Sequence, residues 1–310
     1  MVLTGRAPER YAPEMVRTAL AALLRAVPTL LAALLVGCAT SSTSSSGPPA
    51  PAPAPASGPA PAAAAKDPTA REGWKLVWND EFDGATLDPS KWVHEQGGLW
   101  NNAELQFYTS RPENVRLEGG FLVLEAREEE YFGNDYTSGR ISTAGKASFT
   151  YGRIEARMKV PTGQGLWPAF WMLGDDFKKV AWPGCGEIDI VEVIGKEPAT
   201  AHATIHGASF HGGGGIHGSY KLPSGVLSDA EHVYAVEWEP GVLRFFIDEV
   251  NFQTLTPRDL PVPEHWLFDK PFYVILNLAV GGTWPGLPDE TTKFPAQLRV
   301  DHVRVYERAG

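Results

Sequence analysis

Short apolar segments separated by turn residues dominate the chain from Trp74 to Tyr306. Segments such as "FLVLEA", "GRIEARMKV", "TAHATIHG" and "YVILNLAV" recur, with Gly, Pro, Asn and Asp between them. No stretch of useful length after residue 70 has the helical period. Regularly spaced short strands of this kind are typical of sandwiches and barrels. We therefore predict an all-β fold for one large domain over residues 72–310.

The N-terminal part of the chain has a different character. Arg17 and Arg25 precede a short apolar run that ends in "LVGC", Leu35–Cys38. A charged start followed by an apolar run too short to span a bilayer as a stable helix predicts a signal peptide over residues 1–38. Small residues before a cysteine resemble a bacterial lipoprotein signal, which implies that Cys38 is lipidated. A plain secretory signal and an uncleaved anchor remain alternatives.

Residues 39–71 are rich in Ser, Pro and Ala, and this composition predicts a disordered tether. We expect an exported chain that is lipid-anchored in the cell envelope or secreted. Ala39, where an Asp would indicate retention, favours the outer membrane. The net charge of −10 argues against a nucleic-acid partner and against a basic membrane-surface role. We expect a monomer with a neutral partner.

Three acids interrupt a segment that otherwise reads as a buried strand, "GCGEIDIVEVIG", residues 184–195. Alternate residues of a strand share a face, so Glu187 and Asp189 point one way and Glu192 points the other. A β-bulge at Ile190–Val191 would turn Glu192 back onto the shared face. We therefore predict a bulged strand with three carboxylates on one surface.

The spacing of the two outer acids indicates a chemistry. Glu187 and Glu192 would lie roughly 13 Å apart between Cα atoms. If the side chains lean inward, their carboxyl groups approach to roughly 5 Å, the separation of a retaining glycosidase. A solvated acidic face and a cation site are the alternatives, and the spacing alone leaves them open.

Seven segments, in order, resemble landmarks of glycoside hydrolase family 16, in particular its laminarinase-like members. They are "WNDEFDG", "ELQFYTSRPENV", "YGRIEARMKVPTGQGLWPAFWMLG", "WPGCGEIDIVE", "TIHG", "ILNLAVGG" and "VDHVRVY". The resemblance implies a jelly-roll β-sandwich of the concanavalin A-like type with a concave glycan-binding cleft. It also implies endo-hydrolysis of β-1,3-glucan with retention and without a catalytic cofactor.

The resemblance assigns roles to the three acids. Glu187 matches the nucleophile that forms a covalent glycosyl-enzyme. Glu192 matches the general acid that later acts as base toward water. Asp189 matches the assisting carboxylate between them.

Aromatic and polar residues predict the sugar-binding surface. In "GLWPAFWML", Trp167 and Trp171 share one strand face, with Phe170 and Met172 on the other. The alternative is that one or both Trp side chains belong to the core. We expect Trp167 and Trp171 to face the cleft as a pair, and Trp284, in a Gly-rich loop, to border it. The positions that match cleft residues of the family are Asn102, Arg140, Trp182 and His206. For Arg140 a surface ion pair is the alternative.

The resemblance also implies a structural calcium ion on the convex side. The matching positions are Glu81, the backbone of Gly120, and Asp301. Oxygen ligands suit calcium, and plain surface acids are the alternative. Cys185 is expected to be a small buried filler rather than a redox group.

Two other functions remain open from the sequence. Family members with the same acid spacing act on agarose or carrageenan, and mixed-linkage β-glucan is a further substrate class. A glucan-binding protein that has lost catalysis is the alternative outside the enzymes. Relatives of that type usually lack the acids, and all three are present here.

Overall fold

The computed structural model describes residues 69–98 and 102–310. The predicted signal peptide, Cys38 and almost the whole predicted tether lie outside these described residues. Within the described part, no helix combines the length and the apolar character needed to cross a bilayer.

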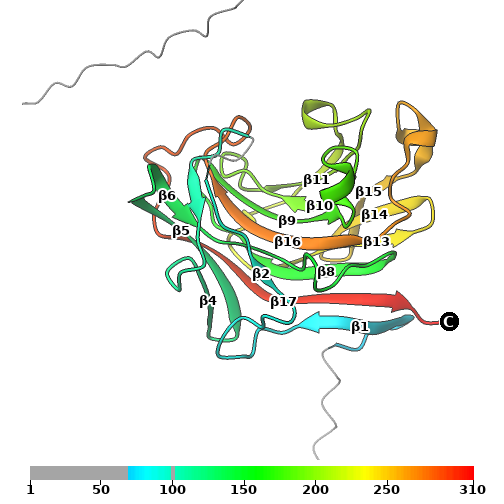
Figure 1. Cartoon of the computed structure of the whole chain (residues 1–310), viewed down its shortest axis with the longest axis horizontal. Helices are drawn as coiled ribbons and strands as arrows, with labels where there is room; N and C mark the ends of the chain where they lie inside the picture. The colour runs from blue at the N-terminus through cyan, green and yellow to red at the C-terminus, as the bar shows by residue number, and fades with distance from the viewer. Residues whose placement is uncertain (1–68, 99–101) are drawn as a thin grey trace, which may run out of the picture. The chain divides into compact units, whose positions relative to one another are not determined.

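Two stacked β-sheets form the described domain (Figure 1). The larger sheet has ten strands, in the order β15 (Val250–Leu255), β14 (Val242–Ile247), β13 (His232–Glu239), β8 (Gly152–Lys159), β17 (Ala296–Arg308), β5 (Phe121–Tyr131), β6 (Asn134–Ser138) and β3 (Gln106–Tyr108), with β1 (Trp74–Asp80) paired to β17 and β4 (Val115–Glu118) paired to β5. The smaller sheet has seven, in the order β12 (Ile216–Lys221), β11 (Thr200–His206), β10 (Glu187–Glu192), β9 (Leu166–Gly174), β16 (Phe272–Val280), β7 (Arg140–Ser142) and β2 (Val93–His94).

Helical structure in the described residues is confined to short turns. These are α1 (Phe177–Val180) and the 3₁₀ turns η1 (Gly212–Gly214), η2 (Pro257–Asp259) and η3 (Pro263–His265). The strand pairs are antiparallel except for β3 with β6. The expected all-β sandwich is therefore confirmed.

The hydrophobic core lies between the two sheets. Strand β9 contributes Phe170 and Met172, both fully buried, whereas Trp167 and Trp171 on its other face are only partly buried. The larger sheet contributes residues such as Trp238 from β13. The alternation predicted for β9 is therefore correct, and one face of the smaller sheet is left to line a surface.

Strand β10 carries the predicted bulge. Its pairing with β11 shifts between Asp189 and Glu192, and its pairing with β9 shifts between Asp189 and Val191. Ile190 and Val191 both pack into the core in spite of being neighbours. The bulge thus places two consecutive apolar side chains inside and returns Glu192 to the outer face.

Candidate active site

Directly paired residues of neighbouring antiparallel strands share a face, so the register of the smaller sheet defines rows of side chains on its outer surface. Glu187 is paired with His206 on β11 and with Leu173 on β9. Asp189 is paired with Thr204 and Trp171. The acids on β10 therefore lie beside an aromatic ring and a histidine.

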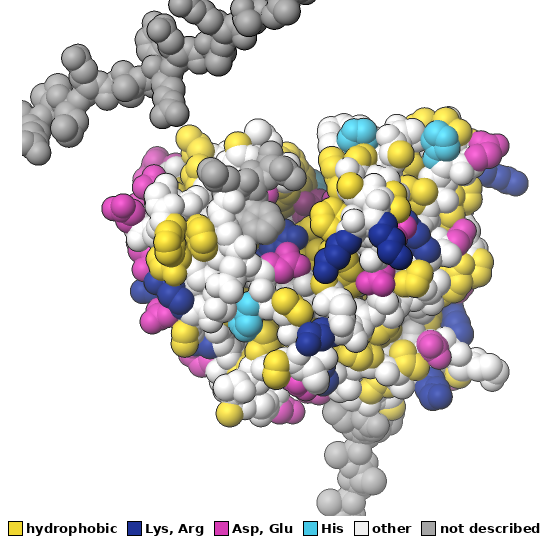
Figure 2. All heavy atoms as spheres, viewed as in Figure 1, with side chains coloured by type: hydrophobic (Ala, Val, Ile, Leu, Met, Phe, Trp, Pro, Cys, Tyr) yellow, Lys and Arg dark blue, Asp and Glu magenta, His cyan; other side chains and the backbone are white. Residues whose placement is uncertain are grey.

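The row that contains Glu192 crosses five strands. It runs from Arg140 through Asn277, Ala169 and Glu192 to His202. All three acids therefore lie on one face, as the sequence predicted. Figure 2 shows the molecular surface hollowed between two raised regions on this side of the domain.

Burial dominates the electrostatics of the three acids. Burial and the charge of Asp189 raise the pKa of Glu187 well above its ordinary value. Burial raises the pKa of Asp189 to about 8, against a hydrogen bond with Glu187 that lowers it. Burial and the neighbouring Asp189 raise the pKa of Glu192 to about 8 as well. The three groups therefore hold protons between them at neutral pH, because they cannot all ionise together.

Glu192 is fixed by a neighbouring tryptophan. The indole Nε1 of Trp167 donates a hydrogen bond to Glu192 Oε1 over 3.0 Å. Trp167 in turn packs edge-on against Trp284, with ring centroids 5.6 Å apart. The carboxyl group is thereby oriented at the surface with one oxygen occupied.

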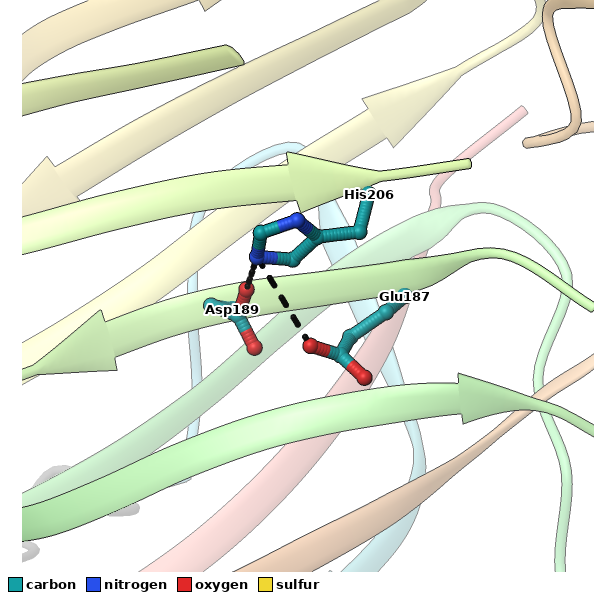
Figure 3. Close-up of side chains that lie close together, drawn as sticks. All are labelled: Glu187, Asp189 and His206. Carbon is teal, nitrogen blue, oxygen red and sulfur yellow. Dashed lines mark ion pairs between the residues drawn. The ribbon is translucent and has the colours of Figure 1, made fainter. Parts of the chain in front are cut away.

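His206 lies over the other two acids, as Figure 3 shows. Its Nε2 is 3.3 Å from Asp189 Oδ2 and 3.8 Å from Glu187 Oε1. Ligand atoms of these three residues lie within 4.8 Å of one another, the one such group of three found in the described chain. The group could hold a divalent cation or share protons between its members.

The predicted tryptophans surround the acids. Trp182 is 41% exposed and lies beside His206, with ring centroids 6.2 Å apart. Trp284 packs against His202 from the opposite end of β11. Lys196 holds the loop of Trp284 by donating to its carbonyl oxygen over 2.7 Å. The aromatic side chains therefore flank the carboxylates along the face of the sheet.

The two polar positions are also at this face. Asn102 accepts a backbone hydrogen bond from Thr283, next to Trp284, and its side chain donates to Glu104. Arg140 donates to Glu95 over 2.5 Å, and its guanidinium carbon lies 4.8 Å from the ring centre of Trp171. Arg140 thus has a carboxylate partner and an aromatic partner at once.

Some residues of the site were missed in the sequence. Asn277 accepts from Trp171 Nε1 over 2.7 Å and donates to Tyr108 over 3.1 Å. The single amide inside "YVILNLAV" could have indicated a buried hydrogen-bonding role for Asn277. Glu95 and Glu104 carried no signal, because they lie in irregular segments whose partners are distant in sequence.

Cys185 is fully buried beside Leu173, Tyr273 and Ile275. Burial raises the pKa of its thiol to about 11, so the expected role as an inert filler is supported.

The positions expected to hold calcium come together only in part. Glu81 follows Asp80, which is paired with Val303, and Gly120 lies two residues before Leu122, which is paired with Val300. Both carboxylate oxygens of Glu81 accept hydrogen bonds from Arg304, at 2.9 and 2.6 Å. Asp301 accepts from Arg157 and contacts His302.

Carboxylates gathered on one strand face, with tryptophans along the same face, suit the paired-acid chemistry of glycoside hydrolysis. Residues 101–304 match the model of the glycosyl hydrolases family 16. The chain is 47% identical over 245 residues to a beta-glucanase of Rhodothermus marinus, across 75% of this chain and 85% of that protein.

Solved structures agree in fold. The endo-beta-1,3-glucanase of Pyrococcus furiosus superimposes with a TM-score of 0.73 and 44% identity, over 76% of this chain and 95% of that one. The laminarinase of Rhodothermus marinus gives 0.71 and 46%, over 76% and 98%. The chain therefore belongs to glycosyl hydrolase family 16 and has its jelly-roll fold.

Proposed function

We propose that this glycoside hydrolase cleaves β-1,3-glucan internally, on laminarin-like polymers, with retention of configuration. The observation that carries the proposal is the bulged strand β10, which turns Glu187, Asp189 and Glu192 to one face beside four tryptophans. Tryptophan faces stack on the apolar faces of glucose rings, and the acidic chain suits an uncharged polymer. The similarity to glucanases of other organisms supports the same substrate class.

In this proposal the reaction has two steps. Glu187 attacks the anomeric carbon and forms a glycosyl ester, while Glu192 gives its proton to the oxygen of the leaving glucan. Water then attacks the same carbon, gives a proton to Glu192 and releases Glu187. The raised pKa of Glu192, about 8, suits the protonated form that the first step needs.

Asp189 and His206 support the charge balance of Glu187. Asp189 can hold the proton that Glu187 must lose before it attacks, because its own pKa is raised to about 8. His206 Nε2 lies 3.3 Å from Asp189 Oδ2, on the other side of this pair from the core. In the proposed reaction Glu187 attacks as an anion once its proton has passed to Asp189.

Product analysis on a panel of polymers tests the substrate. We expect reducing ends and short oligosaccharides from laminarin and curdlan, and little release from agarose or carrageenan. Release from agarose or carrageenan alone would contradict the substrate, and release from lichenan would show tolerance of mixed linkages. Binding of laminarin without release would favour a non-catalytic glucan-binding protein.

A structural calcium ion would rest on backbone oxygens rather than on Glu81. The pairing of β1 and β5 with β17 brings the segments of Glu81, Gly120 and Asp301 to neighbouring strands. Backbone carbonyls and one carboxylate are hard ligands that suit calcium. A rise in melting temperature on adding calcium, reversed by a chelator, is expected, and an unchanged melting temperature would contradict the ion.

We also propose that the protein is exported and anchored through Cys38. The support is the sequence alone, because residues 1–68 lie outside the described residues. Cys38→Ala should move the enzyme from the membrane fraction to the soluble fraction. A variant that stays with the membrane would contradict lipidation at this residue.

A further inference from the structure

Strand β16 contains one buried amide side chain, that of Asn277, and its other eight side chains carry no amide. All nine of its residues are buried, and Asn277 is 7% exposed. Burying an amide without hydrogen bonds costs about 1–3 kcal/mol in proteins. A leucine of similar size would avoid that cost, so the contacts of Asn277 indicate what it contributes.

Both ends of the amide are used. Asn277 Oδ1 accepts from Trp171 Nε1 over 2.7 Å, and Asn277 Nδ2 donates to the Tyr108 hydroxyl over 3.1 Å. An indole nitrogen can only donate, so the direction of the amide is fixed. Tyr108 is fully buried and cannot follow a displaced partner easily.

The ring of Trp171 is restrained a second time. The Arg140 guanidinium lies over it at 4.8 Å, and Glu95 holds Arg140. The contacts thus connect β3, β16, β9 and β7. By contrast, the N–H of Trp167 is bonded to Glu192 and makes no contact with this chain of residues.

The restrained ring lies beside the acids of β10. Trp171 is paired with Asp189, and Ala169 is paired with both Asn277 and Glu192. Ala169 is the small, buried residue between Trp167 and Trp171 on this strand face. Trp171 therefore presents its ring on the same face as Asp189 and Glu192.

We propose that Asn277 is a positioning residue for substrate, which acts through Trp171 by fixing the plane on which a glucosyl unit stacks. The inference rests on the proposed glucanase function and adds a determinant of its binding site. It concerns affinity rather than chemistry, because Asn277 is paired across the sheet with Ala169 and Arg140 and not with an acid.

The first test is Asn277→Leu, which keeps the volume and removes both hydrogen bonds. A variant that loses the same binding energy in the ground state and the transition state has a higher KM and an unchanged kcat. For Asn277→Leu we therefore expect KM to rise about tenfold and kcat to stay within about a factor of two of the wild-type value. The assay uses laminarin well below the melting temperature of each variant. A lower melting temperature with unchanged KM would show a structural role only and overturn the proposal.

Double variants locate the effect. With Trp171→Phe, which has no N–H, adding Asn277→Leu should change KM no further. With Trp167→Phe, whose N–H has another partner, Asn277→Leu should keep its full effect. Equal additivity in both backgrounds would show that Asn277 does not act through Trp171.

If Asn277→Leu does not fold, the variant Tyr108→Phe tests the same proposal. It removes one hydroxyl, frees one end of the amide, and should raise KM by about two- to threefold only where Trp171 is present. An equal rise with Trp171→Phe, or no rise, would overturn the proposal. Wild-type activity on laminarin is measured in parallel: its absence would refute the proposed substrate, and the same comparison would then run on the glucan of the panel that is cleaved.

Discussion

Both sheets of this enzyme bury carboxylates, but they treat them in opposite ways. In the larger sheet Glu125 is buried with Arg116, Arg127 and Gln297 as partners. Burial opposes ionisation of Glu125, yet these partners lower its pKa overall. In the smaller sheet Glu192 has a neutral indole as its partner, and burial raises its pKa to about 8.

The difference separates structural acids from reactive ones. Glu155 in the larger sheet is paired with the fully buried Arg153 over 2.7 Å. In β10, Glu187 and Asp189 lie beside His206, and Glu192 accepts from Trp167. A carboxylate that is buried without a guanidinium keeps its proton, and a proton held at neutral pH is what general acid catalysis requires.

The largest expected effect is on turnover. Glu187→Gln should lower kcat by at least about 10⁴-fold, and Glu192→Gln by about 10²–10⁴-fold, both with the fold intact. Glu125→Gln in the other sheet should leave kcat unchanged, because its partners are structural. The measurement is laminarin hydrolysis by reducing-end release. Near-normal turnover in either acid variant would break the comparison.

The next effect is on stability and falls on the larger sheet. Arg153→Met leaves Glu155 and Glu237 without a guanidinium that now donates to both. Breaking a buried pair from one side should lower the free energy of unfolding by about 3 kcal/mol. Glu192→Gln is the matched control and should not destabilise, because it removes a repelled acid. Denaturant melts of the two variants give the answer, and the reverse order would refute the assignment.

The pH dependence of stability should differ between the sheets. The pKa of Glu192 rises on folding from 4.5 to about 8, so the folded chain binds more protons between these values. The free energy of unfolding therefore falls as pH rises across that window, and Glu192→Gln should flatten the slope. The pKa of Glu125 is lowered, so its stabilisation is present above pH 4.5 and is lost as pH falls through its folded pKa. Thermal melts of Glu192→Gln and Glu125→Gln against pH test both expectations. The account is contradicted if Glu125→Gln changes the slope above pH 4.5 and Glu192→Gln changes it only below.

The smallest effect concerns the partner of the general acid. Trp167→Phe removes the N–H that donates to Glu192, a hydrogen bond that lowers the pKa of Glu192. The alkaline limb of the kcat profile should therefore move to higher pH, with a loss of about tenfold or less in kcat/KM. A shift to lower pH would show that the bond does not favour the ionised form.

The sequence predicted the fold and the bulge for physical reasons. Strand alternation and turn residues are local, so "LWPAFWML" indicated which face of β9 meets the core. The bulge followed from the odd spacing of Asp189 and Glu192, combined with two neighbouring residues, Ile190 and Val191, that both belong to the core.

What the sequence could not predict depends on register between distant strands. Asn277 is paired with Arg140 although 137 positions separate them in the numbering, 277 minus 140. The ion pair of Glu81 with Arg304 joins residues near the two ends of the domain's sequence. Such pairs need the sheet order, which periodicity does not give.

The central claim is that Glu187 and Glu192 have different roles on one bulged strand. It is tested most directly by trapping the enzyme with a 2-fluoro-glucosyl donor that forms the glycosyl ester but hydrolyses it slowly, followed by peptide mass spectrometry. The account predicts one added glucosyl group, on Glu187. An adduct on Glu192, or inverted products with no adduct on either acid, would contradict it.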